Sequence, residues 1–119
     1  MTEAFFFDTY AVIEIISGNP HYEKYRYAEI VLTKLNLFDL FYSILKEDAG
    51  KARHYLKKYE ELAIEFDSNV IQAAAAIKKS NRKLSMTDCI GYAVALKNGM
   101  KFLTGDREFE GMPNVEFMK

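Results

Sequence analysis

Four aspartates in this chain of 119 residues could together carry out hydrolysis if the fold gathers them in one place. They are Asp8, Asp39, Asp88 and Asp106. Hard divalent cations such as Mg²⁺ and Mn²⁺ prefer oxygen ligands, and carboxylates held close together repel one another until a cation relieves the repulsion. A bound cation lowers the pKa of a water molecule, orients it towards phosphorus and stabilises the leaving oxygen. The set therefore suits hydrolysis of a phosphodiester without a covalent nucleophile.

Each aspartate also has a simpler explanation when it is considered alone. Asp8 could cap the helix that follows it, and Asp39 could complement the dipole of a helix in its first turn. Asp88 completes an S-x-x-D capping box that begins at Ser85, and Asp106 suits a turn. The metal site is favoured only if all four carboxylates converge, because such a group is hard to maintain without a cation.

The hydrophobic pattern predicts strands and helices in alternation along the chain. Short apolar runs, such as the aromatic run at Ala4–Phe7, are typical of buried strands. The predicted strands are residues 4–7, 30–35, 62–66, 101–104 and 115–118. The predicted helices are residues 10–16, 21–29, 37–47 with Asn36 as N-cap, 51–60, 67–79 and 85–96. This order implies an α/β fold with a mostly parallel sheet.

The predicted elements place the aspartates where such sheets bind ligands, which is outside the carboxyl ends of the strands. Asp8 directly follows the strand at residues 4–7, and Asp106 follows the strand at residues 101–104 by two positions. Asp39 and Asp88 lie in the first turns of predicted helices. We therefore expect the four side chains to meet at one edge of the sheet.

Composition narrows the class of protein. Half of the residues are hydrophobic, which predicts one folded domain over residues 1–119 with a substantial core. The formal net charge of -1 gives no support to a protein that coats nucleic acid by charge alone, although a bound metal can still receive a phosphate. Cys89 is the only cysteine, which excludes an intrachain disulfide and a cysteine-based zinc site. No segment resembles a signal peptide or a membrane span, so a cytoplasmic location without a membrane partner is expected.

Four segments resemble the motifs of PIN domains, in the order of that family and across nearly the whole chain. They are residues 7–9 (FDT), 37–42 (LFDLFY), 85–93 (SMTDCIGYA) and 102–109 (FLTGDREF). The last of them has the Thr-x-Asp-x-x-Phe pattern that closes the family. The last two segments together are fairly specific, whereas the first alone is a weak signal.

The resemblance implies a PIN-like three-layer α/β/α sandwich around a central, mostly parallel sheet of four to five strands. It also implies an endoribonuclease that depends on Mg²⁺ or Mn²⁺ and hydrolyses RNA. A chain of this size is similar to VapC-type toxins. Such toxins are usually homodimers and are held inactive by a small antitoxin protein that covers the site.

The resemblance also assigns roles to individual residues. The catalytic residues and metal ligands would be Asp8, Asp39, Asp88 and Asp106. Thr104 would support the carboxylate after its strand through its hydroxyl group, and Thr9 could contribute similarly. Two residues depart from the family pattern: Asp39 has one methylene less than the usual Glu, and Tyr10 replaces a residue that is commonly small and polar.

Two other functions compete with the nuclease. A PIN-like module with weak or lost nuclease activity could bind RNA or protein. A phosphotransfer receiver domain also places aspartates at a parallel sheet, but this chain lacks the Lys after a late strand that such a domain needs.

Two further groups of residues could contact partners. Lys101 and Arg107 could contact the RNA backbone near the site. An aromatic set could form a partner surface, although core packing is favoured for most of its members: Tyr22, Tyr25, Tyr27, Phe38, Phe41 and Tyr42.

Overall fold

A four-stranded, fully parallel sheet forms the centre of the computed structural model, which describes residues 3–119. Its strands, in the spatial order β2-β1-β3-β4, are β1 (Ala4–Phe7), β2 (Glu29–Val31), β3 (Lys101–Thr104) and β4 (Val115–Phe117). Phe6, Phe7 and Phe102 in the two central strands have no exposed surface. Strands that are buried on both faces need such continuous apolar runs. The predicted α/β class and the mostly parallel sheet are confirmed.

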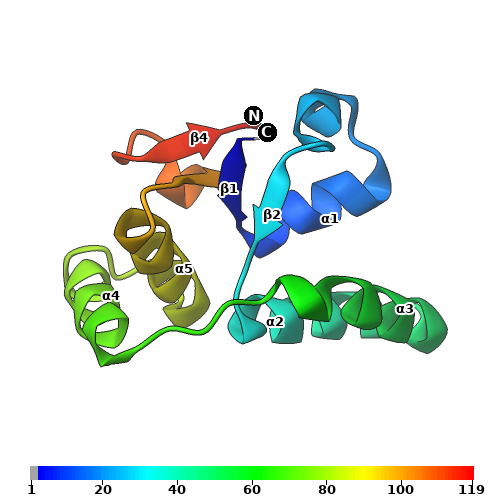
Figure 1. Ribbon diagram of the computed structural model, residues 1–119, viewed down its shortest axis with the longest axis horizontal. Helices are drawn as coiled ribbons and strands as arrows, with labels where there is room; N and C mark the ends of the chain where they lie inside the picture. The colour runs from blue at the N-terminus through cyan, green and yellow to red at the C-terminus, as the bar shows by residue number, and fades with distance from the viewer. Residues whose placement is uncertain (1–2) are drawn as a thin grey trace.

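Helices cover both faces of this sheet (Figure 1). The α-helices are α1 (Thr9–Ser17), α2 (Lys34–Leu45), α3 (Ala49–Tyr59), α4 (Ser68–Ser80) and α5 (Met86–Lys97). Three short 3₁₀ helices accompany them: η1 (Pro20–Tyr25), η2 (Glu60–Leu62) and η3 (Arg107–Phe109). Among residues 3–119, no helix is both long enough and apolar enough to cross a bilayer.

Alternate residues of the central strands supply two separate hydrophobic cores. Phe5 and Phe7 pack with α1, α2, α3 and η1, whereas Phe6 and Phe102 pack with α4 and α5. This division follows from the geometry of a strand, in which successive side chains point to opposite faces. The result is the three-layer arrangement that the sequence predicts.

The predicted strand at residues 62–66 is wrong. Residues Glu60–Leu62 form η2 instead, and only Ala63 makes a parallel bridge, with Leu32 beyond the end of β2. The Ile64 amide donates to the Leu32 carbonyl at 2.8 Å, and Asp67 already caps α4. The segment forms no strand, because β2 ends at Val31 and only Leu32 beyond it pairs with this segment.

The start of α2 also differs from its prediction. The strand predicted at residues 30–35 ends at Val31, because Thr33 caps a helix that begins at Lys34. Asn36 is therefore not the N-cap but the third residue of the helix, where its side chain completes a capping box with Thr33. Asp39 consequently lies in the second turn of α2 rather than the first. The helix predicted at residues 21–29 is limited to η1, because the chain must extend into β2 at Glu29.

Gly91 allows α5 to approach the sheet closely. A Cβ atom at this position would lie 2.7 Å from Cε1 of Phe6 and 3.2 Å from Cε1 of Phe102. Both rings are fully buried and stack on each other, with centroids 5.6 Å apart. A side chain at position 91 would push α5, which also carries Asp88, away from the sheet.

We predict that Gly91→Ala lowers the free energy of unfolding by about 1–3 kcal/mol, which is the usual cost of overpacking a core. Gly50→Ala in α3 is the matched control, because its Cβ would make only an ordinary contact of 3.4 Å with Asp48. The control should be neutral or stabilising, since Ala favours a helix over Gly. Urea unfolding of both variants measures the difference, and equal stabilities would contradict this account of Gly91.

Candidate metal and active site at the carboxyl ends of the strands

Asp8 lies at the end of β1 and is buried, with 5% of its surface exposed. Its Oδ1 atom accepts a hydrogen bond from the Thr9 amide at 2.9 Å, so Asp8 caps α1. Its Oδ2 atom accepts a hydrogen bond from the Thr104 hydroxyl at 2.7 Å. The backbone amide of Asp8 also donates to the Leu103 carbonyl. The carboxylate is thus held between the ends of the two central strands.

The surroundings of Asp8 raise the pKa of its carboxyl to about 7. Burial is the main cause, because it penalises the charged form, and the negative charges of Asp88 and Asp106 add to it. The hydrogen bonds from Thr104 and Thr9 act in the opposite direction, since they favour the carboxylate. Asp8 is therefore an acid that stays protonated at pH values where an ordinary aspartate is fully ionised.

Thr104 connects Asp8 to Asp106. The Thr104 hydroxyl is fully buried, donates to Asp8 and accepts a hydrogen bond from the Asp106 amide at 3.0 Å. Asp106 in turn caps η3 by accepting a hydrogen bond from the Glu108 amide at 3.0 Å. The PIN resemblance predicts that Thr104 supports the carboxylate of Asp106, but its hydroxyl donates to the carboxylate of Asp8 and contacts only the backbone of Asp106.

Gly105 between these two residues is tightly enclosed. A Cβ atom there would lie 2.3 Å from the Met118 carbonyl oxygen and 2.4 Å from Cε1 of Tyr10. Tyr10, which departs from the family pattern, therefore fills the space beside the turn that leads to Asp106. The larger residue contributes packing beside this turn.

Asp88 occupies the capping box that the sequence predicts. Its Oδ2 atom accepts a hydrogen bond from the Ser85 amide at 2.9 Å, while its own amide donates to the Ser85 hydroxyl. The pKa of Asp88 is nevertheless raised above its ordinary value, first by partial burial and then by the charges of Asp106 and Asp39. The cap and a place in the acidic group coexist in one residue.

Asp39 joins the group from α2, and its side chain is half-buried. It lies close enough to Asp88 for its charge to raise the pKa of that residue. Repulsion therefore links all four predicted aspartates, because Asp88 also acts on Asp8 and Asp106 acts on both. The set that the sequence singled out faces one region of the molecule.

No basic side chain neutralises this acidic group within residues 3–119. The ion pairs there join Arg26 to Glu23, Lys97 to Asp67, and Arg107 to Glu110. Uncompensated carboxylates at the end of a sheet are the oxygen donors that Mg²⁺ and Mn²⁺ prefer, so the donor set fits a divalent cation. In the same described residues, however, no three acidic, histidine or cysteine side chains are arranged to hold one ion already. Coordination would require these side chains to move closer together.

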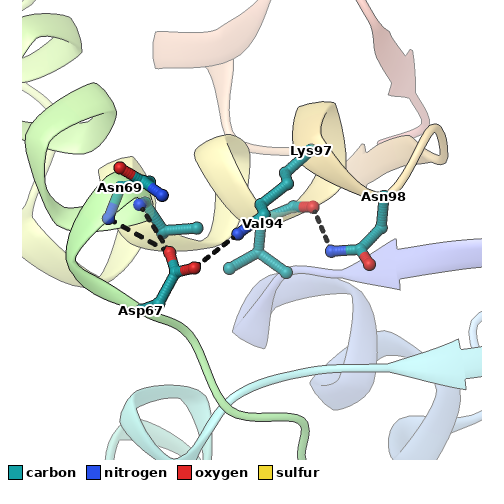
Figure 2. A network of polar contacts seen from close by, with 6 residues as sticks. Asp67, Asn69, Val94, Lys97 and Asn98 are labelled. Atoms are coloured by element: carbon teal, nitrogen blue, oxygen red, sulfur yellow. Dashed lines mark hydrogen bonds and ion pairs between the residues drawn. The ribbon is translucent and has the colours of Figure 1, made fainter.

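Asp67 shows what a purely structural aspartate looks like in this molecule. Figure 2 shows it at the start of α4, where Oδ1 accepts hydrogen bonds from the Asn69 and Val70 amides, both at 3.1 Å. Its Oδ2 atom contacts Nζ of Lys97 at 2.7 Å. The hydrogen bond from Lys97 is the main reason that the pKa of Asp67 is lowered. Asp8 and Asp88 cap helices too, but their pKa values shift in the opposite direction.

Two buried polar residues lie near the acidic group, and the sequence did not predict them there. Asn36 is 2% exposed and Thr33 is fully buried, and the Asn36 amide donates to the Thr9 hydroxyl at 3.2 Å. The available signal was the Thr-x-x-Asn spacing of a capping box, which would have moved the start of α2 to Lys34.

The two basic residues that were expected to contact RNA, Lys101 and Arg107, lie in different places in the structure. Lys101 begins β3 and pairs in register with Phe5, so it lies at the amino end of the sheet, opposite the acidic group. Its expected position near the site is wrong, because the site lies at the carboxyl end of the same strand. Arg107 is exposed and directly follows Asp106, so it does lie beside the site. Burial raises the pKa of the neighbouring Tyr10, and the charge of Arg107 acts against that shift.

The aromatic set divides between core and surface. Tyr22 and Tyr25 are buried, and Phe41 is partly buried against the same core. Tyr27, Phe38 and Tyr42 are exposed by 83%, 70% and 56%. Only these three remain available to a partner.

A family model described as the PIN domain matches residues 5–115. The chain belongs to the PIN domain family. The resemblance of the four motif segments is thereby confirmed over almost the entire chain. No curated protein sequence matches the chain.

Several solved structures share this PIN fold. A toxin–antitoxin complex from Klebsiella pneumoniae has a chain that superimposes with a TM-score of 0.74 at 20% identity, covering 94% of this chain and 95% of that one. DNA-bound VapBC from Salmonella typhimurium gives 0.71 at 16% identity, covering 98% and 97%. VapBC2 from Rickettsia felis, bound to a DNA fragment from its promoter, gives 0.69 at 16% identity, covering 94% and 95%. At these identities the likeness establishes the fold.

The raised pKa of Asp8 makes the effect of Asp8→Asn depend on pH. The folded protein keeps the Asp8 proton up to about pH 7, whereas an ordinary aspartate loses it near 3.8. Ionisation of Asp8 therefore costs the folded state more as the pH rises through this range, and the cost is complete above pH 7. Asn cannot ionise. The free energy of unfolding of D8N minus that of wild type should therefore increase by about 2–4 kcal/mol between pH 4 and pH 8.

Urea unfolding in EDTA at the two pH values measures this change. Asp67→Asn is the control with the opposite sign, because the ionised Asp67 is stabilised by Lys97 and the variant should lose stability at pH 8. The account of Asp8 is wrong if D8N shows the same difference from wild type at both pH values.

Proposed function

We propose that this PIN domain is an endoribonuclease that depends on Mg²⁺ or Mn²⁺, and that it is the toxin of a VapBC-type toxin–antitoxin pair in the cytoplasm. The buried carboxyl of Asp8 is the observation that carries the proposal. Burial and the charges of Asp88 and Asp106 raise its pKa, and no basic side chain of residues 3–119 forms an ion pair with any of these three aspartates. Asp8, Asp88 and Asp106 would hold the cation, and Asp39 would complete the set.

The chain prepares this site before substrate arrives. Thr104 orients Oδ2 of Asp8 and the backbone of Asp106, and the Ser85 capping box orients Asp88. A bound divalent cation lowers the pKa of a water molecule and neutralises charge on the phosphate. Once a cation has drawn the carboxylates together, these hydrogen bonds would keep them oriented during the reaction, and preorganised groups of this kind are a main source of electrostatic catalysis. Arg107 beside Asp106 is positioned to contact an RNA phosphate.

The toxin assignment is supported by the fold shared with VapBC complexes and by an exposed apolar face on α2. Phe38 and Tyr42 stack on this face, with ring centroids 6.4 Å apart, and a groove of about 610 Å³ lies beside them between Leu37, Phe41 and Leu56. Exposed apolar patches of this kind mark contact surfaces. An antitoxin bound here would contact the helix that also carries Asp39. A homodimer is part of the same proposal.

A PIN-like module that binds RNA or protein without cleavage is the second candidate. It is favoured by the observation that no three acidic side chains of residues 3–119 are already arranged around one ion. Metal binding and cleavage therefore decide between the two functions.

We predict that Asp8→Asn and Asp106→Asn each lower the rate of RNA cleavage at least about 100-fold, the scale for loss of one group that stabilises charge in the transition state. Both variants should also weaken binding of Mn²⁺, measured by isothermal titration calorimetry. Asp67→Asn is the control, because that carboxylate is far from the site and paired to Lys97 (Figure 2). A wild-type protein that neither binds Mn²⁺ nor cleaves RNA would leave the binding module as the function.

We predict that replacing Phe38 and Tyr42 together by Ser weakens binding of the antitoxin at least about 10-fold and leaves RNA cleavage unchanged, because both rings are exposed and add little to the core. The antitoxin would be the product of a short reading frame next to this gene, co-expressed and purified for calorimetry. Tyr27→Ser is the control, since Tyr27 is exposed but lies outside α2. Unchanged affinity of the double variant would rule out the α2 face.

A further inference from the structure

Asn36 makes more hydrogen bonds than a helix cap requires. Its Oδ1 atom accepts from the amide and the hydroxyl of Thr33, both at 3.0 Å, and the bond from the amide completes the capping box. Its Nδ2 atom donates in addition to the Thr9 hydroxyl at 3.2 Å. Burying an amide is costly unless it is satisfied, and a Glu or Gln is the usual residue at this place in a capping box. The bond to Thr9 is therefore a contact that the cap itself does not explain.

This bond joins the two parts of the chain that carry Asp8 and Asp39. Thr9 follows Asp8, and its backbone amide donates to Oδ1 of Asp8 at 2.9 Å. Asp39 lies three residues after Asn36 in α2, and residues spaced in this way share one face of a helix. A buried polar link thus runs from α2, which carries Asp39, to the residue that follows Asp8.

We propose that Asn36 is a positioning residue that sets the distance between Asp39 and Asp8 through its hydrogen bond to Thr9. This inference rests on the proposed metal site. Asp39 has a shorter side chain than the Glu usual at this position, so its carboxylate reaches the group only if the backbone of α2 lies close. Asn36 supplies a directional contact that fixes the position of the backbone.

The test compares Asn36→Ala in the wild-type and Asp39→Asn backgrounds. In wild type, we expect Asn36→Ala to weaken Mn²⁺ binding about 10-fold, the lower end for loss of a residue that orients a ligand. In the D39N background the same change should weaken binding less than about 2-fold, because the residue on which Asn36 acts no longer ligates. An equal loss in both backgrounds would overturn the proposal, since it would show a general structural effect.

Three further variants separate positioning from stability. Thr9→Val removes the acceptor from the other side and should reproduce the result, including the case where N36A fails to fold. Asp39→Glu in the N36A background should restore Mn²⁺ binding, because the longer side chain regains the reach. Val70→Ala destabilises the core between α4 and α5, away from Asp39, and should leave Mn²⁺ affinity unchanged.

Crystal structures of wild type and N36A without metal distinguish failure of this inference from failure of the proposed function. We expect the Asp39 and Asp8 carboxylates to lie further apart in N36A. An unmoved Asp39 would overturn the role of Asn36 even if the wild type cleaves RNA. Absence of Mn²⁺ binding in wild type would overturn the metal site, while the two crystal structures would still decide whether Asn36 positions Asp39.

Discussion

Repulsion between carboxylates at the carboxyl ends of β1 and β3 is the constraint to which the surrounding structure responds. The two central strands run in parallel, so the residues that follow them, Asp8 and Asp106, emerge at the same edge. Thr104 stabilises this arrangement of Asp8 and Asp106, because its buried hydroxyl donates to Asp8 and accepts from the Asp106 amide. Burial still raises the pKa of Asp8 to about 7. The folded chain thus keeps an acid whose ionisation is costly.

A helix cap does not exclude an aspartate from the acidic group of this molecule. Asp8 caps α1, Asp88 belongs to the capping box of α5 and Asp106 caps η3. An N-terminus favours a nearby negative charge and also fixes the side chain in one orientation. Asp67 has the same kind of cap but is exposed and paired to Lys97. Burial and lack of a basic partner, rather than capping, distinguish the acidic group.

The packing of the helices determines how closely the carboxylates can approach. Gly91 lets α5 lie against Phe6 and Phe102, and this brings Asp88, one turn earlier, over the end of the sheet. On the other face, the buried amide of Asn36 ties α2 to Thr9. A close apolar contact thus positions one helix of the site, and a directional hydrogen bond positions the other. The contact of α5 depends on the absence of a side chain at Gly91, whereas the contact of α2 depends on the polar side chain of Asn36.

The positions of Asp8, Asp88 and Asp106 in the fold were predictable from the sequence because their signals are local. The apolar run before Asp8, the Ser85–Asp88 box and the Thr-x-Asp ending each identify a strand end or a helix start within a few residues. The parallel sheet then follows from the alternation of elements, and with it the edge at which Asp8 and Asp106 meet.

Other features depended on contacts between distant segments. The segment at residues 62–66 has the composition of a strand, but its partner β2 ends at Val31, so only one bridge forms. Lys101 was expected near the site and lies at the opposite end of β3. Asn36 was expected to begin a helix, yet its role depends on Thr9, which lies 27 residues earlier in the chain. By itself the sequence determined the ends of β1 and β3 and the capping box of α5, because those preferences act over a few residues. Only the tertiary structure decided which carboxylates are buried, paired or left to repel one another, because burial and charge depend on what the rest of the chain packs around them.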